Sequence, residues 1–178
     1  MKKIINVLLV CITISCITSC SVRKQDKIQP KYNNQTISRL SKQFGIRLTQ
    51  TDNIALYDAC SRWLGVKYRY GGNTKNGVDC SGLTSIIYKQ VYKVQLERSS
   101  ANILRKNCTP IKRNALREGD LVFFRTSGSG NAKNPTHVGI YFKNGKFIHA
   151  SSSKGVMVSN LSEPYYVRTW ITGGRVKR

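Results

Sequence analysis

The stretch Val78-Asp79-Cys80-Ser81-Gly82 decides the fold, because it places a cysteine at the start of a predicted helix. Apolar residues follow it at helical spacing: Leu83, Ile86, Ile87, Val91 and Val94. At a helix N-terminus the dipole and the free N–H groups favour an anion, which can bring a thiol pKa from about 8.5 to roughly 3.5–7.5. We therefore expect Cys80 to be a reactive thiolate, the alternative being an inert thiol buried in the core.

Two further helices are predicted before this one. Asp52 is expected to cap a helix from Asn53 to Leu64, with Gly65 at its C-terminal end. A short helix is expected over Thr36 to Phe44, where the apolar pattern stops at Gly45. Both lie N-terminal to all the predicted strands.

Strands are predicted in the second half of the chain. The unbroken apolar run Leu121 to Phe124 indicates a buried strand. His137 to Phe142 and Lys146 to Ala150 indicate a hairpin around Asn144-Gly145, and Tyr165 to Ile171 a later strand. The chain contains only two histidines, and both lie in this hairpin.

The length of the hairpin turn decides whether the two histidines share a face of the sheet, because side chains alternate along a strand. A two-residue turn would place His137 and His149 on opposite faces. A three-residue loop over 143–145, with Gly145 as a left-handed bulge, pairs Phe142 with Lys146 and makes the imidazoles diagonal neighbours, with side-chain origins roughly 7 Å apart or less. We expect the bulged turn, since the chemistry requires both rings together.

A cysteine at a helix N-terminus and two histidines on one face can form a nucleophile, a base and an orienting group. His137 would take the proton of Cys80, and His149 would orient the His137 ring. A positioned base contributes on the order of 10²- to 10⁴-fold in rate. The alternative is that the two histidines only form hydrogen bonds inside the sheet and have no catalytic role. Zinc is disfavoured, since Cys60, Cys80, Cys108 and the histidines lack C-x-x-C or H-x-x-x-H spacing, so no metal or cofactor is expected.

At these residues the sequence resembles the NlpC-type family of bacterial cell-wall peptidases, which are papain-like cysteine hydrolases. The resemblance covers most of Leu56 to Trp170, in five blocks: 63–72, 78–82, 116–124, 137–141 and 147–151. It implies an α+β fold in which helices presenting the cysteine pack on an antiparallel sheet carrying the histidines. It also implies that Cys80 is the nucleophile, His137 the base and His149 the third polar residue.

The same resemblance implies the substrate. Family members hydrolyse amide bonds in peptidoglycan stem peptides or cross-links. Tyr68 matches a tyrosine that lines the site, and Asp79 and Ser81 match positions beside the subsite for the stem peptide. An amidase acting at the sugar-to-peptide junction would use the same three catalytic residues. A non-catalytic, basic wall-binding lipoprotein would not need them together.

The first twenty residues predict export. Met1-Lys2-Lys3 is positive, and the apolar run from Ile4 to Ile17 is too short to span a hydrocarbon core of roughly 30 Å as a helix. Ile17-Thr18-Ser19-Cys20 resembles a bacterial lipobox, which implies that Cys20 is lipidated and becomes the mature N-terminus. Cys16 is the weaker candidate, and an uncleaved anchor is the alternative.

The charge of the exported part is strongly positive. The chain has 30 basic and 8 acidic residues, and cleavage before Cys20 would leave 28 against 8, a net charge of +20. Outside the cytoplasm this favours an anionic wall polymer or a membrane surface, whereas no motif indicates a nucleic-acid partner. A diffuse solvated charge without a specific partner is the alternative.

The length of 178 residues suits one domain with appendages. We expect a signal peptide over 1–19, a lipidated tether with a possible short helix over 20–48, and the catalytic domain over 49–178. The predicted partners are peptidoglycan and, through the lipid, a membrane. The predicted location is the periplasmic side of a bacterial membrane in the cell envelope, leaning to the outer membrane. Cys60 and Cys108 are expected to stay unpaired.

Overall fold

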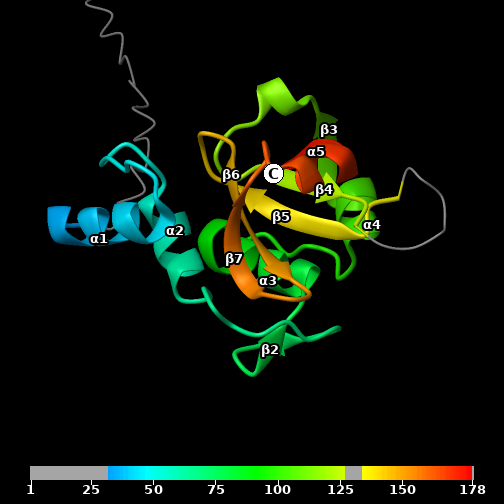
Figure 1. Cartoon of the computed structure of the whole chain (residues 1–178), viewed down its shortest axis with the longest axis horizontal. Coiled ribbons are helices and arrows are strands. Elements are labelled where there is room, and N and C mark those ends of the chain that lie inside the picture. The colour runs from blue at the N-terminus through cyan, green and yellow to red at the C-terminus, as the bar shows by residue number, and fades with distance from the viewer. Residues whose placement is uncertain (1–31, 127–133, 178) are drawn as a thin grey trace, which may run out of the picture.

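The computed structural model describes residues 32–126 and 134–177, which form an antiparallel sheet with helices on both faces (Figure 1). Six strands lie in the order β3-β8-β4-β5-β6-β7, and every neighbouring pair is antiparallel. They are β3 (Cys108–Ile111), β4 (Leu121–Phe124), β5 (His137–Tyr141), β6 (Lys146–Ser151), β7 (Gly155–Asn160) and β8 (Trp170–Val176). A separate small hairpin comprises β1 (Asn73–Thr74) and β2 (Gly77–Val78). The expected α+β class is confirmed.

The helices cover the two faces of the sheet. They are α1 (Asn34–Phe44), α2 (Ile54–Ser61), α3 (Cys80–Tyr92), α4 (Ser100–Asn102), the π-helical η1 (Ile103–Asn107), the 3-10 helical η2 (Arg113–Ala115) and α5 (Pro164–Thr169). On β4, Leu121 and Phe123 join the core that contains α3, whereas Val122 and Phe124 pack with Tyr166 of α5. Both faces of β4 are therefore buried, which explains its unbroken apolar run.

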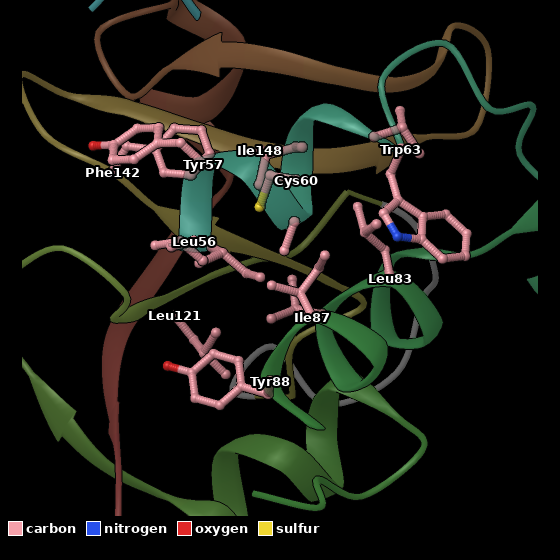
Figure 2. Packing of buried hydrophobic residues seen from close by; sticks show 14 of the residues in the cluster. Leu56, Tyr57, Cys60, Trp63, Leu83, Ile87, Tyr88, Leu121, Phe142 and Ile148 are labelled. Carbon is pink, nitrogen blue, oxygen red and sulfur yellow. The ribbon is translucent and has the colours of Figure 1, made fainter. Parts of the chain in front are cut away.

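The main hydrophobic core lies between the first helices and the sheet. Figure 2 shows Cys60 of α2 among Leu56, Tyr57 and Ile148. The ring of Tyr57 lies 4.7 Å from that of Phe142 at the end of the hairpin. The same core includes the apolar face of α1: Ile37, Leu40 and Phe44. The first helix therefore packs into the same core as α2 and α3.

The N-terminal predictions fall partly within the described chain. The helix expected over 36–44 is confirmed as α1, which begins two residues earlier and ends at left-handed Gly45. The predicted signal peptide, Cys16, Cys20 and the tether up to residue 31 lie outside the described residues. Across residues 32–126 and 134–177, no helix is both long and apolar enough to cross a membrane.

The cap predicted for α2 was wrong by one residue. Asn53, and not Asp52, caps the helix by accepting the N–H of Leu56 at 3.2 Å. Asp52 instead accepts the N–H of Thr49 at 2.6 Å and pairs with Lys143 of the hairpin. Its carboxylate is thus committed to a turn and a tertiary ion pair. The helix also ends three residues earlier than predicted.

The hairpin between β5 and β6 has the predicted register. The N–H of Phe142 donates to the C=O of Lys146 at 2.9 Å, and the strand pairs beyond follow the same alignment. Two loop residues are left-handed, Asn144 with φ 56° and Gly145 with φ 77°. The loop therefore consumes three residues, and the side chains of the two histidines fall on one face of the sheet.

The strand predicted over Tyr165 to Ile171 was wrong in its first part. Pro164 occupies the first helical position, where a missing N–H is harmless, and the chain continues as α5. The N–H of Tyr166 donates to the C=O of Glu163 at 2.9 Å and closes the first turn. The strand, β8, begins only at the end of α5, and β3 and β7 had no predicted counterpart.

Candidate active site

The side chain of Asp79 holds the N-terminus of α3 in place. It caps the helix by accepting the N–H of Gly82 at 2.7 Å, and its other oxygen accepts the N–H of Gly71 at 2.8 Å. The guanidinium of Arg98 donates to both oxygens, at 2.7 and 2.9 Å. Although burial raises it, these hydrogen bonds hold the pKa of Asp79 below its ordinary value. Cys80, the first residue of the helix, is fixed as a result.

The thiol of Cys80 is more basic than the sequence predicts. Its side chain is buried, and burial raises its pKa above the ordinary value. The backbone N–H of Val138, the residue after His137, opposes this by hydrogen bonding to the sulfur, and the neighbouring Asp79 carboxylate adds to the rise. The expected low pKa was wrong, because the desolvation imposed by the sheet exceeds the effect of the helix terminus.

The two histidines form a buried pair. Nε2 of His137 lies 2.9 Å from Nδ1 of His149, with the rings nearly perpendicular. Burial lowers the pKa of His137 to about 4; burial, and then the neighbouring His137, lower that of His149 to about 3. Both rings are therefore neutral at pH 7. Since its Nε2 is engaged by His149, His137 has its Nδ1 left to act as a base.

The cysteine and the histidines open onto adjoining cavities. One cavity of about 490 Å³ is lined by Cys80 together with Tyr68, Tyr70, Asp79, Ser81, Arg98 and Thr136. A second, of about 140 Å³, is lined by the two histidines together with Tyr68, Thr136, Ser151 and Tyr166. Tyr68 and Thr136 border both cavities, so the two adjoin; together they are called the cleft below, with the thiol at the first cavity and the imidazoles at the second.

All the predicted site residues within the described chain lie at this cleft. Tyr68, Asp79 and Ser81 share the cavity of Cys80, as the resemblance implied. The sequence reasoning missed the hydroxyls beside His149, which belong to Ser159 of β7 and Tyr166 of α5. No motif marks them: the pairing of β7 with β6 brings Ser159 to His149, and the packing of α5 brings Tyr166. In the part of the chain that the structure describes, no group of three His, Cys, Asp or Glu side chains could hold a metal ion.

Comparison with known proteins gives one family. The sequence model of the NlpC/P60 family matches residues 65–175. The chain is 39% identical over 121 residues to the murein DD-endopeptidase MepS/murein LD-carboxypeptidase of Escherichia coli (strain K12), covering 68% of this chain and 61% of that protein. It is 42% identical over 121 residues to the probable endopeptidase NlpC of the same organism, covering 68% of this chain and 76% of that protein.

Solved structures show the same fold. An NlpC/P60 family protein from Bacillus cereus ATCC 10987 aligns with a TM-score of 0.61 at 28% identity, covering 69% of this chain and 39% of that one. The NlpC/p60 domain of the peptidoglycan hydrolase SagA aligns with a TM-score of 0.56 at 25% identity, covering 72% of this chain and all of that domain. The chain spans 61% of the length of the first curated relative, so the match concerns one domain of these proteins.

Proposed function

Because the chain belongs to the NlpC/P60 family, we propose that it is a cysteine peptidase that hydrolyses amide bonds in peptidoglycan stem peptides or cross-links. The observation that carries the proposal is the cleft, onto which Cys80 and the paired imidazoles of His137 and His149 all open. The names of the relatives, murein endopeptidases among them, support murein as the substrate class.

The geometry supports a mechanism that begins from a neutral Cys80 thiol and a neutral His137 imidazole. His137 takes the proton of Cys80 on Nδ1 as the sulfur attacks the carbonyl carbon of the scissile amide. The N–H groups of Val138, Ser81 and Cys80 lie near the sulfur and stabilise negative charge there as the proton leaves. The protonated His137 then donates its proton to the leaving amine, and water attacks the resulting thioester with His137 again as base.

The Arg98–Asp79 ion pair supports the proposed catalytic role of Cys80 by holding this residue in a fixed position at the cleft. Asp79 is only 7% exposed, yet its carboxylate stays charged because Arg98 and two backbone N–H groups satisfy it. Arg98 also donates to the C=O of Gly72, which ties the loop after Tyr68 to the same site. The wall of the cleft beside Cys80 is therefore pre-organised for a substrate.

Digestion of purified peptidoglycan tests the proposal. The wild-type chain is expected to release fragments cut within the peptide, and Cys80→Ala and His137→Ala are expected to release none while keeping a cooperative thermal transition. Cys108→Ala is the matched control, because Cys108 is a buried thiol on β3 outside the catalytic cleft. Digestion by Cys80→Ala at the wild-type rate would contradict the proposal. Products that carry intact peptides free of sugar would establish an amidase instead.

We further propose that the mature chain begins at Cys20 and carries lipid there, which holds it on the periplasmic side of a bacterial membrane, the outer membrane in preference to the inner. The stretch Ile17-Thr18-Ser19-Cys20 supports the assignment. Cys20→Ala is expected to leave the precursor unprocessed or to release the protein from membrane fractions, and Cys16→Ala to change little. Palmitate labelling that persists in Cys20→Ala would refute it.

A further inference from the structure

A cluster of buried polar groups surrounds the far side of His149. Its Nε2 lies 3.0 Å from the hydroxyl of Tyr166 on α5 and 3.2 Å from that of Ser159 on β7. The hydroxyl of Ser159 also donates to that of Tyr166 at 3.4 Å. His149, Ser159 and Tyr166 are 2%, 5% and 7% exposed, so three separate elements converge on one imidazole nitrogen away from solvent.

This arrangement favours one tautomer of His149. A ring N–H can be shared between two acceptor oxygens, whereas the single lone pair of a bare ring nitrogen takes one donor. Because Ser159 gives its one hydroxyl proton to Tyr166, its oxygen can meet Nε2 only as an acceptor, which requires a proton on Nε2. The neutral ring then has a bare Nδ1, which accepts the hydrogen bond from Nε2–H of His137. His137 is left with a bare Nδ1, the state that a general base requires.

The reaction itself imposes the same requirement. When the S–H bond of Cys80 breaks and the proton forms a bond to Nδ1 of His137, both nitrogens of that ring carry protons. Nε2 of His137 must then donate, Nδ1 of His149 must accept, and the proton of His149 must stay on Nε2. Among the described residues, the hydroxyls of Ser159 and Tyr166 lie within hydrogen-bond reach of that nitrogen.

We propose that Tyr166 and Ser159 are positioning residues, which hold His149 in its Nε2–H tautomer so that it can accept a hydrogen bond from His137 before and after proton transfer. The inference rests on the proposed function, since it concerns the same reaction. Neither hydroxyl touches the reacting atoms, and each acts through His149. A histidine in the third position, unlike an amide, needs such partners because only one of its tautomers accepts from His137.

Removing the hydroxyls tests the effect on rate. Tyr166→Phe keeps the ring, which packs at 5.1 Å from Phe124 and 4.8 Å from Phe147, and Ser159→Ala removes a single oxygen. Each single variant is expected to lower kcat about 2- to 5-fold, because the other hydroxyl remains, and the double variant about 10- to 100-fold, with KM unchanged. Tyr141→Phe, which removes a hydroxyl bonded to the hairpin turn, is the matched control.

The same substitutions in a His149→Asn variant distinguish a positioning role from a general loss of folding or stability. In the His149→Asn background the amide oxygen accepts from His137 without any tautomer to fix, so adding Tyr166→Phe and Ser159→Ala is expected to change kcat less than 2-fold. An equal loss in both backgrounds would mean that the hydroxyls serve the fold and would overturn the proposal. So would a double variant with wild-type kcat, or one whose loss is entirely in KM.

The tautomer can also be observed directly. Nitrogen-15 NMR of histidine-labelled wild type at pH 7 is expected to show His149 protonated at Nε2 and bare at Nδ1, and the double variant is expected to lose this preference. A wild-type His149 protonated at Nδ1 would overturn the inference, even if every variant failed to fold. The spectrum needs no substrate. It therefore decides the inference independently of whether the chain hydrolyses peptidoglycan.

Discussion

Mild acid is expected to destabilise the folded protein through its buried histidines. The chain has only two histidines, His137 and His149, and burial lowers their pKa values to about 4 and about 3. In the unfolded chain a histidine titrates near pH 6.5. Between pH 6.5 and 5 the unfolded state therefore binds protons that the folded state excludes.

The sign and the size follow from linkage. A depressed pKa in the folded state leaves stability intact above pH 6.5 and removes it as the pH falls toward the folded pKa, at up to about 1.4 kcal/mol per pH unit for each group. From pH 6.5 to 5 the pair is expected to cost about 3 kcal/mol of the free energy of unfolding. Carboxylates with a lowered pKa, such as Asp52 and Asp79, contribute only below about pH 5, because they titrate near 3.9 when unfolded.

Urea unfolding followed by tryptophan fluorescence at constant ionic strength measures this dependence. Wild type is expected to lose about 3 kcal/mol between pH 6.5 and 5, His149→Asn about half of that, and the double variant His137→Asn/His149→Asn close to nothing. An NMR titration of the folded imidazoles supplies an independent check, with both midpoints expected below pH 5. A wild-type stability that is flat over this range, or equally steep in the double variant, would refute the reasoning.

Three further outcomes are expected. Arg98→Lys keeps the charge but loses the two-point contact with Asp79. The free energy of unfolding should fall by only about 1 kcal/mol, because Arg98 is partly exposed, while kcat/KM should fall more strongly. A variant that hydrolyses peptidoglycan at the wild-type rate would contradict this. Alkylation of Cys80 by iodoacetamide should accelerate with pH through pH 8, as its raised pKa requires, and a plateau below pH 7 would show a resting thiolate. Cys60 and Cys108, both buried and free in the structure, should stay unmodified in the folded protein, as peptide mass spectrometry can verify.

Features set by neighbours in sequence were predicted well. The apolar stripe after Cys80 places the start of α3 correctly, because helical spacing is visible in neighbouring residues alone. The hairpin register followed from the turn at Asn144-Gly145 and the demand that both histidines share a face. The catalytic roles of those residues stay predictions, supported by their place at the cleft.

Features set by distant segments were missed. The raised pKa of Cys80 depends on burial beneath β5, which no local pattern reveals. Ser159 approaches His149 because β7 pairs with β6, and Tyr166 does so because α5 folds back over that sheet. The sequence from Tyr165 to Ile171 suits a strand by composition, and the helix there depends on Pro164 and on packing against the sheet.

The turn between β5 and β6 lies at the far end of the hairpin from the cleft, yet its length is not free to vary. Surface loops usually accept insertions and deletions, and a protein engineer would regard Lys143 to Gly145 as a natural place to shorten or extend the chain. Removing one residue would move every side chain of β6 to the opposite face, so that Ile148 would face α5 and His149 would face the apolar core. Insertions should therefore be made at other loops of this fold. In this turn, the smallest change that keeps the faces of β6 is the insertion or deletion of two residues.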